Sequence, residues 1–235
     1  MTGLEFNWYT ISIMDTLAQE PGVRDEADSR PLSVVAYAAL LDMILRDALG
    51  SGELVTERQI AARLGMSRTP VREAVHRLEG EGTLERQRSG ALVVHPYSME
   101  EFLHVLAVRR LLEGEAARLA AGRIAPQALA DARVRIARLR TAGLGETARS
   151  GDRDFHAAIA EASGNPVLAT SLGDLRKRTA MFRLGRLPER LSQVCDEHLA
   201  IVEALERGDG EAARTAMQTH IDNVRAFLME RLNAI

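Results

Sequence analysis

Residues 64–74 read Leu-Gly-Met-Ser-Arg-Thr-Pro-Val-Arg-Glu-Ala and contain the signals that end one helix and begin another. Gly65 supplies a C-terminal stop for the helix before it, and Ser67 stands where the N-cap of the next helix is expected. Gly80 and Gly82 close that second helix. The stretch therefore predicts two helices joined by a short turn that contains glycine.

The flanking sequence completes a unit around this stretch. Thr56 and Gln59 have the spacing of a capping box ahead of an apolar run, which predicts the first helix of the pair. From Pro31, apolar residues recur at three- and four-residue spacing and predict an earlier helix of about fifteen residues. Two short apolar runs, 83–86 and 91–94, flank a turn and read as a β-hairpin. Two helices, a short turn and a hairpin form a winged helix-turn-helix.

The second helix of such a unit lies in the major groove of DNA, where its first residues contact base edges. Arg68 and Arg72 are four residues apart, so both project from one helix face, and arginine can bind guanine bidentately. Hydroxyls at a helix N-terminus hold phosphate. A solvated charged helix is the alternative, but the combination of capping box, glycine turn, arginine pair and hairpin favours DNA binding. The candidate contacts are Arg58, Ser67, Arg68, Thr69 and Arg72, with Arg88, Ser89 and Gly90 at the wing, which can reach the adjacent minor groove.

The distribution of charge supports this interpretation better than the net charge does. The chain has 30 basic and 33 acidic residues and a formal net charge of −3, yet residues 58–77 carry five arginines against one acid, Glu73. A local basic patch on a near-neutral chain is expected where one face meets phosphate. No apolar stretch is long enough to span a membrane, and no secretory signal is recognisable. The single Cys195 fits a reducing compartment, so we expect a cytoplasmic protein.

The rest of the chain is expected to be helical. Residues 1–30 show no sustained period, so a flexible extension is expected there. We therefore predict a mainly α-helical chain, with a winged helix-turn-helix and its small β-hairpin over 31–97 and an antiparallel bundle of about six helices over 98–235. Gly, Pro or Asn signals separate the expected helical segments 98–121, 126–143, 146–162, 165–184, 188–207 and 210–233.

The helical half contains a second group of polar residues. Asp152 and His156 are four residues apart and share a helix face, whereas the rival carboxylate of Asp154 points to another side. His198 and His220 lie in two later helices that a bundle can bring to the same place. Three imidazoles and one carboxylate suit Zn, Ni, Mn or Fe, with positions open to water or a ligand carboxylate. From the residues alone, however, hydrogen-bonded structural histidines explain the pattern better.

Several of these runs resemble a known family. The stretch 44–94, above all Ser-Arg-Thr-Pro-Val-Arg-Glu-Ala at 67–74, closely resembles the GntR family of bacterial regulators. Residues 98–234 resemble the ligand-binding domain of its FadR subfamily, the FCD domain, a bundle of six or seven helices. The marks of that domain are Val-Arg-Arg-Leu-Leu-Glu at 108–113, Asp152-x-x-Phe155-His156, Ala-Ser-Gly-Asn-Pro-Val-Leu at 162–168, Glu197-His198-x-x-Ile201 and His220.

The resemblance implies operator contacts by Arg58, Arg68, Thr69, Arg72 and the wing tip. It also implies a metal ion, with Zn as first choice and Ni, Mn or Fe as alternatives, and a small organic acid bound to it. Arg109 is the candidate anion-binding residue, since a guanidinium can clamp a carboxylate, but an ion pair with Glu113 one turn away is an equal alternative. The metal ligands implied are Asp152, His156, His198 and His220.

Together these features predict a ligand-responsive transcriptional repressor, not an enzyme, that binds double-stranded operator DNA as a homodimer. The operator is expected to be pseudo-palindromic. One alternative is the same regulator without a metal, in which the four polar residues are structural. Another is a metal-dependent enzyme domain fused to the helix-turn-helix, although no general base stands beside the metal ligands. The residues do not set the sign of regulation, so an activator is also an open alternative.

Overall fold

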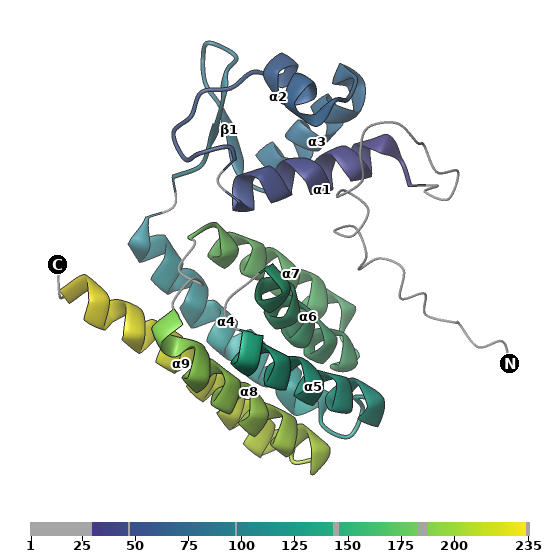
Figure 1. The fold of residues 1–235 in the computed structure, drawn as a ribbon, viewed down its shortest axis with the longest axis vertical. Helices are drawn as coiled ribbons and strands as arrows, with labels where there is room; N and C mark the ends of the chain where they lie inside the picture. Colours follow the sequence, from purple (N-terminus) through teal and green to yellow (C-terminus); the bar gives the residue numbers. More distant parts are fainter. Residues whose placement is uncertain (1–29, 47, 97, 143–145, 183–187, 234–235) are drawn as a thin grey trace, which may run out of the picture.

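The computed structural model describes residues 30–46, 48–96, 98–142, 146–182 and 188–233, so the expected extension 1–30 lies outside the described residues except for Arg30. The chain folds into two units (Figure 1). The first contains α1 (Leu32–Leu45), α2 (Glu57–Leu64), α3 (Arg68–Gly80), β1 (Leu84–Arg86) and β2 (Leu92–Val94). The second contains α4 (Met99–Ala120), α5 (Pro126–Ala142), α6 (Glu146–Ala162), α7 (Pro166–Met181), α8 (Leu191–Glu206) and α9 (Gly210–Asn233).

Residues close together in the sequence determine where α2 begins and ends and where α3 begins. The Thr56 hydroxyl accepts a hydrogen bond from the Gln59 amide at 3.3 Å, and the Gln59 side chain accepts one from the Thr56 amide at 2.9 Å. Gly65 ends α2 in the left-handed region at φ +62°, which favours glycine. Ser67 occupies the N-cap of α3, but its hydroxyl makes no capping hydrogen bond. The expectation of a side-chain cap is therefore wrong, and that hydroxyl is left for another partner.

The hairpin closes the first unit over a shared core. β1 and β2 pair antiparallel with Leu84 opposite Val94 and Arg86 opposite Leu92, as the two apolar runs predicted. Alternation along each strand turns one set of side chains inward. These side chains join apolar residues of all three helices in one core, whose fully buried members include Leu40, Ile60, Val71, Leu78 and Leu92.

α4 is the central helix of the second unit and packs against α6, α7 and α9 (Figure 1). Its capping box resembles that of α2: the Ser98 hydroxyl accepts from the Glu101 amide, and the Glu101 carboxylate accepts from the Ser98 amide. Because α4 contacts so many neighbours, a polar side chain on its inner face lies at the centre of the bundle.

Two helix boundaries differ from the sequence prediction. α7 ends at Met181, whereas a helix over 165–184 was expected, and residues 183–187 lie outside the described part of the chain. The segment expected as one helix over 188–207 begins with a 3₁₀ turn, Pro188–Arg190, before α8. Such turns are common at helix N-termini. Among the described residues, no helix combines the length and the apolar character that crossing a bilayer requires.

Candidate DNA-binding surface and metal centre

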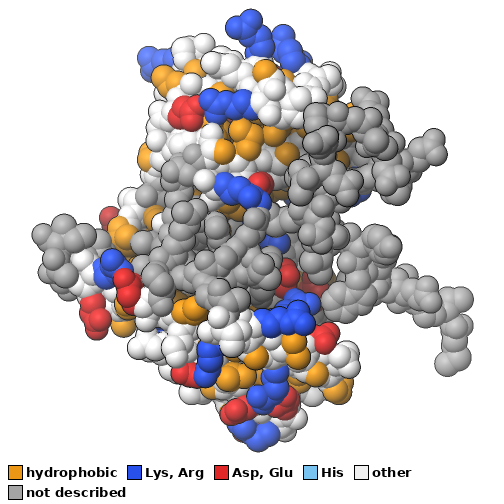
Figure 2. Space-filling model, viewed as in Figure 1, with side chains coloured by type: hydrophobic (Ala, Val, Ile, Leu, Met, Phe, Trp, Pro, Cys, Tyr) orange, Lys and Arg blue, Asp and Glu red, His pale blue; other side chains and the backbone are white. Residues whose placement is uncertain are grey.

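The expected DNA-contacting residues all belong to the first unit. All eight are exposed: Arg58, Ser67, Arg68, Thr69, Arg72, Arg88, Ser89 and Gly90. In Figure 2, arginine side chains project from the end of the molecule where Figure 1 places α2 and the hairpin, since the single lysine, Lys177, lies on α7. Arg68 makes no hydrogen bond or ion pair with any other residue that the structure describes. Arg72 differs, because its Nε lies 3.4 Å from Oε2 of Glu57.

The wing has the backbone of a tight turn. Gly90 adopts φ +84°, and the Gln87 amide donates to the Ala91 carbonyl at 2.8 Å. The Ser89 hydroxyl accepts a weak hydrogen bond from the Ala91 amide at 3.4 Å. These contacts close the turn of the hairpin that a winged helix-turn-helix uses as its wing.

The second unit brings the four predicted metal ligands together. One ligand atom from each of Asp152, His156, His198 and His220 lies within 4.8 Å of the others. Oδ1 of Asp152 is 3.7 Å from Nε2 of His156 and 3.5 Å from Nε2 of His198. The ring centroids of His198 and His220 are 4.7 Å apart. Asp154 points away and lies near Arg135 instead, as its position on the helix predicted.

The donor atoms fit a metal ion. Nε2 of His156 and Nε2 of His198 are buried and have no hydrogen-bond partner in the described part of the chain, although buried polar atoms nearly always have one. Both histidine side chains are at most 2% exposed, while that of Asp152 is 41% exposed, so the cluster opens towards solvent at the carboxylate. Two unsatisfied imidazole nitrogens beside a carboxylate are the ligand set that a divalent transition metal prefers.

Two further carboxylates orient the imidazoles. Nδ1 of His156 donates to Glu113 on α4, and Nδ1 of His220 donates to Glu197 at 2.7 Å. A proton held on Nδ1 leaves the lone pair on Nε2, which then faces the cluster. Neither glutamate was expected in this role, although Glu197 precedes His198 directly and Glu113 follows Arg109 by one turn.

Two arginines border the cluster and differ in their contacts. Arg109 donates to Glu113 at 2.6 Å and to the Thr179 hydroxyl at 2.9 Å, so the ion pair that competed with an anion-binding role is present. Arg176 donates to Oδ2 of Asp152 at 2.7 Å and lies 3.4 Å from Glu113, while its buried Nε has no partner. Arg176 is therefore the cation in direct contact with a candidate metal ligand.

Burial favours the neutral form of His156 and His198. Burial, together with the charge of Arg176, outweighs the opposing effect of Glu113 and lowers the pKa of His156 to about 4. Burial, helped by His220, holds the pKa of His198 well below its usual value. Burial raises the pKa of Glu113, but Arg109, His156 and Arg176 outweigh it, so the net pKa lies well below the usual range. Neutral imidazoles and ionised carboxylates are the forms that bind metal.

Acid should therefore destabilise the metal-free protein. The pKa of His156 falls from 6.5 unfolded to about 4 folded, so the unfolded state binds the proton more tightly and stability is lost as pH falls between these values. Once pH has fallen to the folded pKa, this difference in the pKa of His156 lowers the free energy of unfolding by about 3 kcal/mol. Urea unfolding in the presence of a chelator, at pH 7.5 and at pH 4.5, measures the loss.

The matched comparison is His156→Gln against His104→Gln, because His104 is exposed on α4. The first substitution should reduce the pH-dependent loss of unfolding free energy, and the second should leave it as in the unmodified chain. Equal losses in both variants would show that His156 does not carry the effect.

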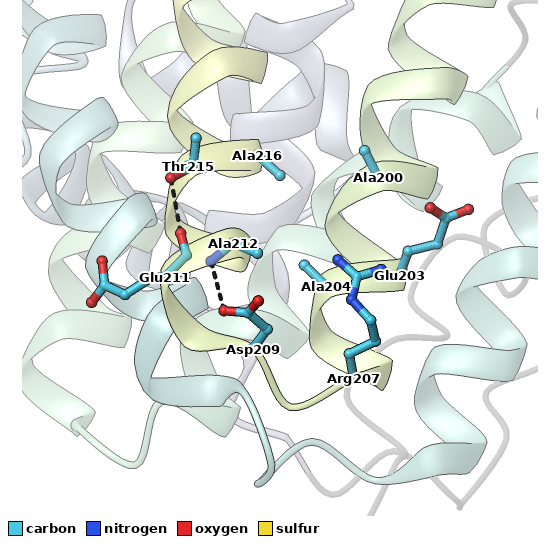
Figure 3. A pocket seen from close by; sticks show the side chains of 9 residues that line it. All are labelled: Ala200, Glu203, Ala204, Arg207, Asp209, Glu211, Ala212, Thr215 and Ala216. Atoms are coloured by element: carbon cyan, nitrogen blue, oxygen red, sulfur yellow. Dashed lines mark hydrogen bonds between the residues drawn. The ribbon is translucent and has the colours of Figure 1, made fainter.

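A shallow surface groove lies elsewhere, where α8 ends and α9 begins (Figure 3). Four alanines line its floor, and the polar groups at its rim hydrogen-bond within their own helix: Asp209 accepts from the Ala212 amide, and Thr215 donates to the Glu211 carbonyl. It shares no residue with the metal cluster. The lining residues are Ala200, Glu203, Ala204, Arg207, Asp209, Glu211, Ala212, Thr215 and Ala216.

Comparison with known proteins assigns both units. Residues 32–94 match the model of bacterial regulatory proteins of the gntR family, and residues 104–223 match that of the FCD domain. The Uxu operon regulator of Haemophilus influenzae is 31% identical over 76% of this chain and 74% of that protein. The HTH-type transcriptional repressor NanR of Citrobacter rodentium is 31% identical over 84% of this chain and 85% of NanR. The solved structure of E. coli McbR/YncC has a TM-score of 0.76 at 25% identity, covering 86% of this chain and 99% of that one.

The family comprises transcriptional regulators, which decides against the metal-dependent enzyme that the sequence left open. The resemblance of residues 67–74 to GntR regulators is confirmed over the whole first unit, and that of the helical half to the FCD domain over most of the second. With a DNA-binding unit of this type followed by this helical domain, the chain belongs to the GntR family of bacterial regulatory proteins and carries an FCD domain.

Proposed function

We propose that this regulator is a repressor that binds a pseudo-palindromic operator as a homodimer, with one α3 helix in each half-site. A divalent transition metal on Asp152, His156, His198 and His220 binds a small organic acid, and the acid alters operator affinity. Zn is the first choice of metal, with Ni, Mn or Fe as alternatives. The observation that carries the proposal is the cluster itself, with two buried imidazole nitrogens that have no partner.

The chemistry of the cluster explains why an acid is the expected effector. Four protein ligands leave positions on an octahedral or five-coordinate ion open, and a carboxylate oxygen can replace water there. The exposed side of Asp152 gives solvent access to the cluster. Arg109 stays the proposed anion-binding residue, and it would have to share its guanidinium between the acid and Glu113.

The exposed arginines support the DNA half of the proposal. Arg68 and Arg72 stand on one face of α3, and Arg68 has no partner among the described residues. A guanidinium that the fold does not use is available for guanine O6 and N7. Repression is the sign that we propose, because the similar protein NanR is a transcriptional repressor.

Metal content is the first test. Protein purified without chelator should contain about one transition-metal ion per chain, measured by elemental analysis. His156→Ala should lose that metal because it removes one of four ligands, whereas the exposed His104→Ala should keep it. Chelation should lower the unfolding temperature of the unmodified chain, because a ligand present at about 100 times its Kd stabilises by about 2.7 kcal/mol. Equal metal content in the two variants would contradict the site.

The effector is tested by operator titration of the metal-loaded chain in the presence of short mono-, di- and tricarboxylates. We expect one class to change operator affinity by at least about fivefold, a coupling of about 1 kcal/mol. The same acid should have no effect on the metal-free His156→Ala variant. A full panel without effect on metal-loaded protein would contradict control by an acid.

A further inference from the structure

Helix α7 contacts both the metal cluster and the DNA-binding unit. Arg176 and Thr179 are three residues apart and share one face of the helix. Arg176 donates to Asp152 at 2.7 Å, and Thr179 accepts from Arg109 at 2.9 Å. This face of α7 therefore carries the side chains that border the candidate metal ligands.

A second face of α7 contacts the first unit. Lys177 and Met181 are four residues apart, and Met181 packs against the core of the winged unit. Nζ of Lys177 lies 3.9 Å from Glu81 and 5.8 Å from the centre of the Tyr37 ring, and it also pairs with Asp174 on its own helix at 3.0 Å. In Figure 1, α7 lies directly beneath α1.

The contact on this second face reaches the recognition helix. Glu81 is the C-cap of α3, and its carboxylate accepts from the Tyr37 hydroxyl at 2.7 Å and from Nε of Arg77 at 3.0 Å. The guanidinium of Arg77 in turn stacks over the Tyr37 ring at 3.8 Å. Tyr37 is 8% exposed while the Lys177 and Glu81 side chains are 33% and 25% exposed, so this contact lies at the edge of the packed core at the end of α3.

The two faces are mechanically linked because they belong to one helix. Arg176 and Lys177 are adjacent residues. A backbone shift that gives Arg176 a new ion-pair partner therefore also moves Lys177. Arg176 donates to Asp152, a residue that the proposed metal would also use, and its buried Nε has no hydrogen-bond partner among the residues that the structure describes. Close-packed interiors change between discrete arrangements rather than deforming smoothly.

We propose that α7 couples the metal cluster to the recognition helix α3. When a metal ion binds Asp152, the ion pair between Arg176 and Asp152 changes and α7 shifts. Lys177 and Met181 then move against Glu81, Tyr37 and the core of the winged unit. This inference rests on the proposed metal site. It assigns to Lys177 and Met181 a role in regulation without a role in binding metal or DNA.

The experiment measures operator affinity of the full chain with zinc sulfate and with a chelator, by fluorescence anisotropy. The probe is a duplex that the unmodified chain selects from a random-sequence pool in both conditions. Lys177→Ala and Met181→Ala are compared with Arg178→Ala, an exposed neighbour on α7. The side chains of Lys177 and Met181 are partly exposed, so the two alanine variants should fold. Calorimetric zinc titration with and without operator gives a second readout, because coupling between two ligands is reciprocal.

In the unmodified chain and in Arg178→Ala, zinc should change operator affinity at least about fivefold, and operator should change zinc affinity by the same factor. In Lys177→Ala and Met181→Ala both ratios should approach one, while zinc affinity without DNA stays unchanged. An unmodified chain that binds no zinc overturns the proposed metal site and this inference with it. Zinc binding without a change in operator affinity, or variants that keep the full ratio, overturns the coupling through α7 alone.

Discussion

Arg68→Ala should lower operator affinity at least about 30-fold while leaving the stability of the protein unchanged. A bidentate arginine–guanine pair contributes about 1–3 kcal/mol, and a dimer would lose it in both half-sites. The fold should not respond, because Arg68 is exposed and has no partner among the described residues. Anisotropy titration on the selected duplex measures the affinity, and urea unfolding measures the stability.

Arg138→Ala is the matched control, since Arg138 is an exposed arginine on α5, far along the chain from the winged unit. It removes the same charge and should leave operator affinity within about twofold of the unmodified chain. If both substitutions weaken binding equally, the effect is one of net charge, and the placement of α3 in the major groove is wrong. The discrimination between selected and unrelated duplexes should also fall in Arg68→Ala only.

Glu113→Ala should reduce the free energy of unfolding by about 3–5 kcal/mol, the usual result of removing one partner from a buried ion pair. Glu113 is 2% exposed and accepts hydrogen bonds from Arg109 and His156. Without it, the Thr179 hydroxyl is the only hydrogen-bond partner that the described residues still offer to the buried guanidinium of Arg109. Urea unfolding of metal-free protein at neutral pH measures the change.

Glu115→Ala provides the comparison on the same helix. Glu115 pairs with Arg118 and Arg214, but its side chain is 35% exposed, and pairs of this kind contribute about 0–1 kcal/mol. Glu113→Gln should fall between the two, because the amide keeps an acceptor but not the charge. A loss in Glu113→Ala no larger than in Glu115→Ala would show that the buried network does not stabilise the bundle.

The winged unit was predictable because its signals are local. The Thr56–Gln59 capping box, the left-handed Gly65 and the two apolar runs of the hairpin each depend on residues a few positions apart. Such signals determine where helices and strands begin and end whatever the rest of the chain does. The cap expected from Ser67 failed because residue type fixes the N-cap position but not the direction of the hydroxyl.

The metal cluster was only partly predictable. The spacing of Asp152 and His156 places both on one face of α6, and Asp154 on another. Nothing local relates that pair to His198 and His220, which come from α8 and α9, so their convergence depended on the family resemblance until the bundle was seen. The histidine–carboxylate contacts link α6 to α4 and α9 to α8, and no local sequence pattern predicts them.

By itself, then, the sequence determined the order and type of the elements, the exposed arginine pair on α3 and the candidate ligands. Tertiary structure decided which of them meet: Glu113 with Arg109 and His156, Arg176 with Asp152, and Lys177 with the end of α3. The physical reason is that helix periodicity acts over three or four residues. Pairing of buried charges is set instead by helices that pack side by side although they lie far apart in the chain.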